Sequence, residues 1–356
     1  KITFFIPYFC PMKAIFPAPF SLENTQEAFK ARALELFAFQ YKYNAVYHEF
    51  CRLLKKTPQQ VQTIEDIPFL PISFFKTHQV ITQLPLEPAE AFAEIKPLGK
   101  SIDSLFYFTS SGTTGSETSK HFVPDLSLYE ASYMAAFEIF YGPVENYCVL
   151  ALLPAYLERE GSSLIYMAED LIKKSRHPQS GFYLHDHEAL YKTLLDLESK
   201  NAPVFLIGVS FALLDFSEKY GMSLKNTIVM ETGGMKGRRK EMIREALHEK
   251  LGSGFGVSKI HSEYGMTELL SQAYSKGDGI FDTPPWMKIL IRDTEDPFNF
   301  VGDGKTGGVN VIDFANIHSC AFIATQDLGK TFSDNSFSIL GRFDSAAIRG
   351  CNLLVP

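Results

Sequence analysis

A short stretch rich in hydroxyl side chains and glycine constrains this chain more than any other feature. Residues 106–120 read Phe-Tyr-Phe-Thr-Ser-Ser-Gly-Thr-Thr-Gly-Ser-Glu-Thr-Ser-Lys, and the stretch begins inside a short apolar run. Glycine lets a backbone approach a ligand closely, and successive backbone N–H groups can surround an anion. The common kinase or ATPase loop requires Gly-Lys-Ser/Thr, whereas Lys120 follows no glycine.

This composition predicts a loop that binds a polyphosphate, with Lys120 as a nearby positive charge. A surface turn of small residues is the alternative interpretation. The residues expected to cradle the phosphates are Thr109, Ser110, Ser111, Gly112, Thr113, Thr114 and Gly115.

Length and charge limit the possible classes of protein. With 356 residues, one large or two ordinary domains are expected. Apolar residues make up 46% of the chain, and 31 Phe with 16 Tyr indicate an aromatic-rich interior. A net charge of −7 without a long basic block argues against a nucleic-acid surface. No run reaches the roughly 18 apolar residues of a spanning helix, so no membrane span is expected.

The five cysteines form no recognisable framework. None are in Cys-x-x-Cys spacing, which argues against a zinc site or a set of disulfides. Reduced thiols in a cytoplasmic protein are expected. The chain begins at Lys1 rather than Met, so whether residues 1–11 are native or Met12 is the start stays open.

Apolar runs alternate with helical patterns in the middle of the chain. This alternation predicts an α/β fold with a parallel sheet. The expected strands are Tyr147–Leu153, Val204–Val209 and Thr227–Met230; the expected helices are Phe211–Tyr220 and 236–251, the latter ending at Gly252.

The two flanking regions differ from this middle part. The first hundred residues look mostly helical, with Phe29, Ala33, Leu36 and Phe37 on one face, until the prolines of 67–76 break any helix. Ser127–Glu130 resembles a capping box that opens a helix to about residue 140. From about 286 onward the pattern changes to short strands, expected at Met287–Ile291, Gly308–Phe314 and Phe337–Leu340.

Four segments after the loop carry side chains suited to a nucleotide. Glu231–Met235 holds two glycines after a predicted strand, where open α/β sheets bind ligands. Glu263-Tyr-Gly-Met-Thr-Glu268 offers an aromatic face, a hydroxyl and a carboxylate, and hard carboxylate oxygens suit Mg²⁺.

The other two segments suit a ribose. Asp327, beside a turn glycine, can accept both ribose hydroxyls, and Arg342 in Gly341-Arg-Phe-Asp344 offers a fork of donors. Each segment alone also has an ordinary explanation as a turn or a surface ion pair.

The order of these segments resembles that of the adenylate-forming superfamily of acyl-CoA synthetases and related ligases. Within it, the chain is most similar to the acyl-protein synthetases of bacterial fatty-acid reductase systems, the long-chain-fatty-acid–luciferin-component ligases. Segments 67–76, 153–163 and 284–287 strengthen the resemblance, which runs from about residue 24 to the C-terminus.

The resemblance implies an α/β adenylation fold: mixed and parallel sheets flanked by helices and a small β-rich C-terminal subdomain. The expected division is an adenylation core over 1–285 and a subdomain over 286–356. It also implies an enzyme that uses ATP and Mg²⁺ to activate a carboxylic acid, expected to be a fatty acid, as an acyl-adenylate. The acyl group then passes to a cysteine of the same chain, for delivery to an acyl reductase partner.

The resemblance also assigns roles to residues. Thr267 would contact the α-phosphate, Glu268 would bind Mg²⁺, and Cys351, with Arg349 nearby, would carry the acyl group. The residues implied to hold the adenine and ribose are Gly233, Gly234, Tyr264, Gly265, Met266, Asp327 and Arg342.

The chain departs from the superfamily in two places. It ends at Pro356, so the usual mobile C-terminal domain and its lysine are expected to be absent, with Lys120, Arg349 or Lys330 as substitutes. The hydroxyl-rich loop also lacks the usual Pro-Lys ending.

Other interpretations stay open from the sequence. Gly208-Val-Ser-Phe-Ala212 resembles the nucleophile elbow of a serine esterase, and His185 with His187 suggests either a metal site or a polar turn. An acyl- or aryl-CoA ligase like the phenylacetate–CoA ligases, or a non-catalytic adenylate-binding partner of a reductase, would keep the same fold.

Overall fold

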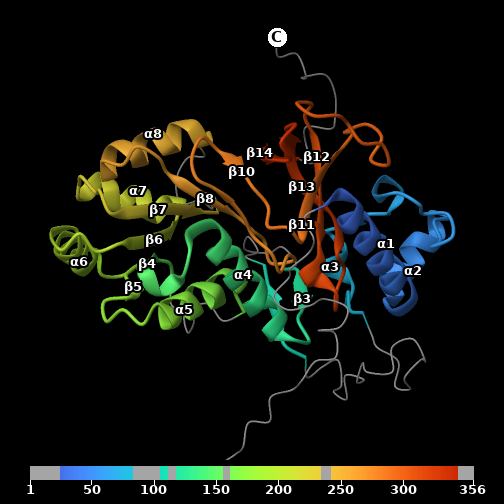
Figure 1. Cartoon of the computed structure of the whole chain (residues 1–356), viewed down its shortest axis with the longest axis horizontal. Helices are drawn as coiled ribbons and strands as arrows, with labels where there is room; N and C mark the ends of the chain where they lie inside the picture. Colours follow the sequence, from blue (N-terminus) through green and yellow to red (C-terminus); the bar gives the residue numbers. More distant parts are fainter. Residues whose placement is uncertain (1–24, 83–104, 111–117, 155–160, 234–241, 344–356) are drawn as a thin grey trace, which may run out of the picture.

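Two β-sheets lie side by side, with helices packed against them (Figure 1). The computed structural model describes residues 25–82, 105–110, 118–154, 161–233 and 242–343. The parallel sheet has the strand order β5-β4-β6-β7-β8-β9, and the antiparallel sheet has the order β10-β14-β13-β12-β11, with β1 added beside β13. Buried hydrophobic residues of both sheets belong to one connected cluster.

The parallel sheet is buried on both faces. Its strands are β4 Cys148–Leu152, β5 Gly181–Phe182, β6 Val204–Val209, β7 Thr227–Thr232, β8 His261–Tyr264 and β9 Ala273–Ser275, with only β9 antiparallel to its neighbour. The Phe205 ring packs 5.0 Å from that of Phe137 in α4, while a Cβ at Gly208 would lie 2.9 Å from Leu213 in α7. Helices on opposite faces explain why these strands are continuously apolar, and the predicted parallel sheet is confirmed.

The helices around this sheet are α4 Leu126–Tyr141, α5 Ser163–Ser175, α6 His187–Ser199, α7 Ser210–Lys219 and α8 Arg244–Phe255. Figure 1 shows α7 and α8 on one side of the sheet and α4 and α5 on the other. A short 3-10 helix, Val144–Asn146, leads from α4 into β4.

Two predicted helix ends were wrong, each because a better cap lies nearby. Asp125, not Ser127, caps α4, since its carboxylate accepts the Ser127 backbone N–H at 2.9 Å and the Ser127 hydroxyl at 2.6 Å. Helix α8 continues through Gly252 to Phe255 and ends at Gly256, whose φ is 67°. A Cβ at Gly256 would lie 2.6 Å from the Met222 carbonyl oxygen, so only glycine fits this left-handed cap.

The antiparallel sheet combines distant parts of the chain. Its strands are β1 Leu70–Pro71, β10 Ile280–Phe281, β11 Met287–Arg292, β12 Gly307–Asp313, β13 Phe322–Thr331 and β14 Phe337–Arg342. The predicted strands after residue 286 are therefore confirmed, whereas β1 and the long β13 were not predicted. The division at residue 285 stays a prediction.

N-terminal helices cover this second sheet. They are α1 Gln26–Tyr43, α2 Ala45–Leu53, the 3-10 helix Ile64–Asp66 and the one-turn helix α3 Phe74–Thr77. The predicted apolar face of α1 is buried: Phe29 stacks on Phe314 at 4.5 Å, and in α2 the Tyr47 ring stacks on Phe322 at 6.0 Å. The prolines do break any helix over residues 67–73, and the one-turn α3 begins three residues after Pro71.

A buried polar network joins the two sheets. The fully buried carboxylate of Asp313, at the end of β12, accepts the backbone N–H of Leu270 at 2.8 Å and that of Ser271 at 3.0 Å. The Trp286 indole N–H donates to Ser132 and Ser271, both at 3.1 Å. These bonds fix the segment after β8, which carries Glu268, between the two sheets.

A hairpin completes the described fold. Strands β2 Tyr107–Thr109 and β3 Lys120–Phe122 pair in antiparallel fashion on either side of the hydroxyl-rich loop. None of the helices in the described ranges combines the length and apolarity that a membrane crossing requires.

Candidate functional site

The carboxyl ends of the parallel strands meet at one edge of their sheet. Strand β6 ends at Val209, β7 at Thr232 and β8 at Tyr264, and these strands are hydrogen-bonded neighbours. This edge is where open α/β sheets bind ligands. The predicted glycine turn and the Tyr-Gly-Met-Thr-Glu segment both begin here.

The glycine turn is held by side chains beneath it. Gly233 is exposed and has a φ of 70°, and its carbonyl oxygen accepts a hydrogen bond from the Ser210 hydroxyl. Thr232 donates its hydroxyl to Glu263. The second predicted glycine, Gly234, lies outside the described residues.

The β2–β3 hairpin fixes both ends of the predicted phosphate loop. Ser110 donates its backbone N–H to the Ser119 carbonyl at 3.2 Å, and the Ser119 N–H donates to the Ser110 hydroxyl at 2.9 Å. The Thr109 N–H donates to the Gly161 carbonyl at 2.7 Å. Lys120 is exposed, with its ammonium 5.3 Å from the centre of the Tyr107 ring. Ser111, Gly112, Thr113, Thr114 and Gly115 lie outside the described residues.

Glu268 lies against the end of this loop. Glu268 is only 5% exposed, and the Ser119 side chain lies near enough to its carboxylate to affect its pKa. Burial raises the pKa of Glu268, and the Ser119 side chain and the positive charges of Arg342 and Lys76 oppose this shift. The structure therefore brings together the loop, the Tyr-Gly-Met-Thr-Glu segment and the Gly-Arg segment.

Two buried side chains that sequence reasoning missed hold the Thr267–Glu268 backbone. His121 Nδ1 lies 2.7 Å from the Thr267 carbonyl oxygen, and Asn316 Nδ2 donates to the Glu268 carbonyl at 2.8 Å. Burial lowers the pKa of His121 to about 4, so its ring is neutral at pH 7. Because a carbonyl only accepts, Nδ1 carries the ring proton. His121 follows Lys120 directly, but nothing in the sequence connects either side chain to residue 268.

The predicted ribose residues also meet. The Tyr264 hydroxyl donates to Asp327 Oδ2 at 2.9 Å, and Arg342 Nε donates to Asp327 Oδ1 at 3.2 Å. Asp327 is buried, whereas the Arg342 side chain is 76% exposed. The buried carboxylate therefore lies beside an exposed cation.

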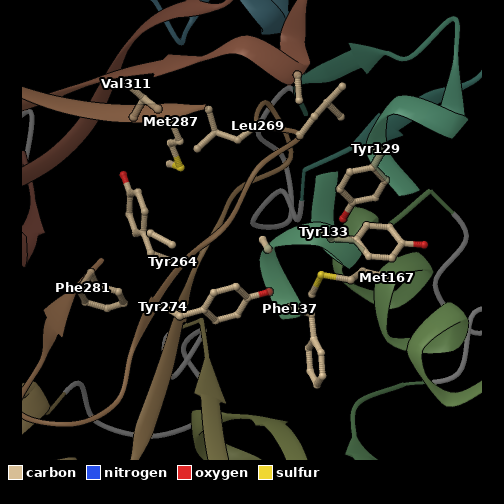
Figure 2. Packing of buried hydrophobic residues seen from close by; sticks show 14 of the residues in the cluster. Tyr129, Tyr133, Phe137, Met167, Tyr264, Leu269, Tyr274, Phe281, Met287 and Val311 are labelled. Atoms are coloured by element: carbon tan, nitrogen blue, oxygen red, sulfur yellow. The ribbon is translucent and has the colours of Figure 1, made fainter. Parts of the chain in front are cut away.

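Tyr264 is more enclosed than an open stacking platform. It is 8% exposed, and its ring makes edge contacts with Phe281 at 6.1 Å and Phe337 at 5.6 Å. Figure 2 shows it among buried residues that include Met287 and Tyr274. Its expected contact with adenine stays a prediction.

The remaining predicted residues are placed as follows. Gly265 is exposed, and a Cβ there would lie 2.2 Å from Glu263 Oε1, so a larger residue at this position would require the Glu263 side chain to shift. Met266 and Thr267 are half-buried. Lys330 lies on β13 with its ammonium 5.4 Å from the Phe332 ring. Arg349 and Cys351 lie outside the described residues.

The alternative of a metal site at His185 and His187 has no support in the structure. No group of three or more His, Cys, Asp or Glu side chains in the described part of the chain is arranged to hold a metal ion. Asp186, between them, caps α6 by accepting the Ala189 N–H at 2.9 Å. The polar-turn interpretation is the one that fits.

Glu263 provides a test of the electrostatics at this edge. Burial raises its pKa from 4.5 to about 7, the nearby Glu231 raises it further, and the Thr232 hydrogen bond opposes both. The folded protein therefore holds this proton at a pH where the unfolded chain has lost it, so stability falls as pH rises from about 4.5 to about 7.

Glu263→Gln is expected to remove this fall, because the amide carries no charge to bury. The quantity to compare is the free energy of unfolding of the variant minus that of the wild type. This difference should be about 2–3 kcal/mol larger at pH 8 than at pH 4.5. Urea denaturation at both pH values measures the difference, with the exposed Glu295→Gln as the control. Parallel pH profiles for Glu263→Gln and the wild type would contradict the assignment.

Comparisons with known proteins concern the family and the fold of the chain. Residues 14–92 match the family model described as "Acyl-protein synthetase, LuxE". The match confirms the resemblance to the acyl-protein synthetases. This matched family is one of synthetases, in agreement with the prediction of an enzyme. A search of curated proteins gave no match to the chain.

Solved structures share the fold at low sequence identity. The ATP-bound MatB from Rhodopseudomonas palustris has a TM-score of 0.52 and 19% identity, covering 71% of this chain and 50% of that one. The 2-hydroxyisobutyryl-CoA ligase in complex with 2-HIB-AMP and CoA has a TM-score of 0.63 and 13% identity, covering 97% of this chain and 74% of that one. The predicted α/β fold of adenylate-forming enzymes is thereby confirmed. The chain spans about half the length of the MatB structures it matches.

Proposed function

We propose that this protein activates a carboxylic acid with ATP, forming an acyl-adenylate and pyrophosphate, and then transfers the acyl group to a thiol. The observation that carries the proposal is the closeness of the Ser119 side chain, in the hydroxyl-rich stretch, to Glu268 of the Tyr-Gly-Met-Thr-Glu segment. Arg342 lies near enough for its charge to act on Glu268, and it also contacts Asp327. These contacts and charges connect four separate sequence segments, which supports a single shared site.

The chemistry requires positive charge and hydrogen-bond donors around the phosphates. A carboxylate oxygen of the acid attacks the α-phosphorus of ATP, and the bond to the β-phosphate oxygen breaks as pyrophosphate leaves. Donors that neutralise the charge developing on these oxygens contribute roughly 3–4 kcal/mol each to the transition state. The hydroxyls and N–H groups of the loop and the exposed Lys120 are suited to this task.

Glu268 fits a magnesium ligand. Its hard carboxylate oxygens are the type that Mg²⁺ prefers, and its pKa is raised because burial outweighs the partners it has. A cation beside it would favour the ionised form. When bound, Mg²⁺ would neutralise phosphate charge in the reaction.

The other site residues bind and orient the nucleotide in this proposal. Asp327 accepts hydrogen bonds from the ribose hydroxyls, with Arg342 beside it, and the exposed Gly233 backbone lies against the base. Tyr264 holds Asp327 in place through its hydroxyl, 2.9 Å away. His121 holds the Thr267 carbonyl so that the Thr267 hydroxyl keeps its position for the α-phosphate.

A cysteine of this chain is the proposed thiol acceptor. Cys51, Cys148 and Cys320 are buried, and burial raises the pKa of Cys51 to about 12 and that of Cys148 to about 11; the pKa of Cys320 is raised as well. Such thiols do not supply the thiolate that attacks an acyl-adenylate. Cys351, which matches the acyl-carrying cysteine of the resembled family, is our candidate, and an acyl reductase that accepts a fatty acyl group is the proposed partner.

The deciding experiment is ATP–pyrophosphate exchange over a panel of aliphatic and aromatic acids, with and without coenzyme A. We expect exchange that needs ATP, Mg²⁺ and an acid, and that does not need coenzyme A. Formation of acyl-CoA without acylation of the protein would instead identify a CoA ligase. Nucleotide binding without exchange for any acid would contradict catalysis and favour an adenylate-binding partner of a reductase.

A further inference from the structure

A buried carboxylate beneath the glycine turn has no role in the chemistry described above. Glu231 lies on β7, two residues before Gly233, and is 6% exposed. Its Oε1 lies 3.5 Å from His248 Nε2 and 3.8 Å from Arg244 Nε. Burial raises the pKa of Glu231, but hydrogen bonds from His248 and Ser262 and the charge of Arg244 outweigh it, so its pKa lies below the usual value.

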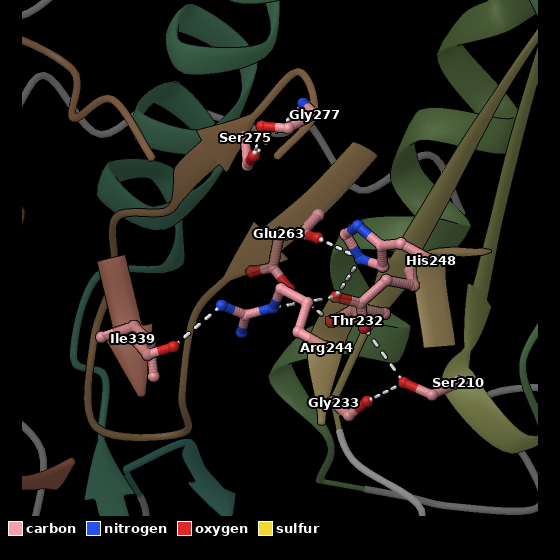
Figure 3. A network of polar contacts seen from close by, with 11 residues as sticks. Ser210, Thr232, Gly233, Arg244, His248, Glu263, Ser275, Gly277 and Ile339 are labelled. Atoms are coloured by element: carbon pink, nitrogen blue, oxygen red, sulfur yellow. Dashed lines mark hydrogen bonds and ion pairs between the residues drawn. The ribbon is translucent and has the colours of Figure 1, made fainter. Parts of the chain in front are cut away.

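Ser210 connects this carboxylate to the turn. Its hydroxyl lies 3.0 Å from Glu231 Oε2 and also donates to the Gly233 carbonyl oxygen (Figure 3). Val209 and Thr232 are register partners in the pairing of β6 with β7. Ser210 and Gly233 directly follow these two residues, so they lie beside each other where the strands end. The residue is 2% exposed.

This placement explains the Gly-x-Ser-x-Ala sequence without a role for Ser210 as a nucleophile. An elbow serine needs an accessible hydroxyl at the top of the sheet. The Ser210 hydroxyl is buried and committed to Glu231 and Gly233. Its role is therefore to hold backbone, not to attack substrate.

Arg244 connects this network to the antiparallel sheet. Its Nη1 donates to the Ile339 carbonyl oxygen in β14 at 3.0 Å, and its guanidinium lies 5.0 Å from the Phe281 ring. Figure 3 shows Arg244 lying between Ile339 and the Thr232–Gly233 end of β7. Arg342, beside the proposed ribose carboxylate, lies on the same strand as Ile339.

We propose that Ser210, Glu231 and Arg244 form a positioning network that fixes the Gly233 turn, against which the base binds, relative to β14, which carries the ribose-binding Arg342. The inference rests on the proposed function, because it assumes that one nucleotide contacts both elements. The network touches no reacting atom. Weakening it lowers affinity for the nucleotide in the ground state and the transition state alike, which raises KM and leaves kcat nearly unchanged.

The test compares two chemically identical changes on one helix. Ser210→Ala removes the network hydroxyl, and Ser217→Ala removes another buried hydroxyl of α7, which donates only to the Leu214 carbonyl of its own helix. We expect Ser210→Ala to raise KM for ATP, and the Kd for ATP without an acid, by roughly 5- to 30-fold. Ser217→Ala should match the wild type, and Ser210→Thr, which keeps the hydroxyl, should restore most of the affinity.

A second variant keeps the inference testable if Ser210→Ala does not fold. The Arg244 side chain is partly exposed, and Arg244→Lys keeps the charge but loses the fork that reaches both Glu231 and Ile339. It should raise the Kd for ATP in the same way. Unchanged Kd values in both Ser210→Ala and Arg244→Lys would overturn the inference, as would ester hydrolysis lost on Ser210→Ala. Failure of the wild type to bind ATP would instead reject the proposed function.

Discussion

Glu268→Gln is expected to lower acid-dependent ATP–pyrophosphate exchange by roughly 100- to 1,000-fold. The amide keeps the shape of the side chain but removes the charge that would hold Mg²⁺ beside the phosphates. Ser119 lies near this side chain, and its hydroxyl is able to donate to an amide oxygen as well as to a carboxylate.

The fold should survive this change. Burial raises the pKa of Glu268, which means that its site favours the neutral form, and glutamine resembles that form. We therefore expect a melting temperature equal to or above that of the wild type. Loss of exchange in a stable protein would separate a chemical role from a structural one.

The measurement is initial exchange rate against Mg²⁺ concentration, together with thermal unfolding. Glu268→Asp should recover part of the rate and need more Mg²⁺, because it keeps a carboxylate on a shorter stem. Glu295→Gln makes the same change on the surface and should behave as the wild type. A rate for Glu268→Gln within threefold of the control would remove Glu268 from the proposed site.

The sequence predicts the parts of this fold in which local pattern and burial agree. The apolar run at Val204–Val209 became β6 with the same bounds, since a strand covered on both faces needs no polar residue. The apolar residues of α1 that share a face are buried for the same reason. Where a competing cap lay two to four residues away, as at Asp125 and Gly256, the pattern alone selected the wrong helix end.

The site shows a different limit. Its motifs could be found because glycine, hydroxyl and carboxylate residues follow predicted strands. The supporting side chains could not, because their partners lie far away in sequence: His121 contacts Thr267, and Arg244 contacts Ile339. A histidine or arginine carries no local sign of which distant carbonyl it will bind, so only the packed structure identifies these residues.

Cys351→Ser is expected to abolish hydroxylamine-labile acylation of the protein while leaving acid-dependent exchange unchanged. Exchange needs only the first half of the reaction, in which no thiol takes part. In the second half, the thiolate attacks the acyl carbonyl, the bond to the phosphate oxygen breaks and AMP leaves. A serine hydroxyl is far less acidic than a thiol and does not replace it.

The matched control is Cys10→Ser, because Cys10 and Cys351 are the two cysteines outside the described residues. Each variant is incubated with ATP, Mg²⁺ and radiolabelled acid, and label is counted on denatured protein before and after hydroxylamine. Label retained by Cys351→Ser but lost from Cys10→Ser would move the acyl carrier to the N-terminal segment. Label lost from neither would mean that another side chain of the protein carries the acyl group. Because exchange is measured on the same samples, either result leaves the assignment of the adenylation site intact and changes only the acceptor.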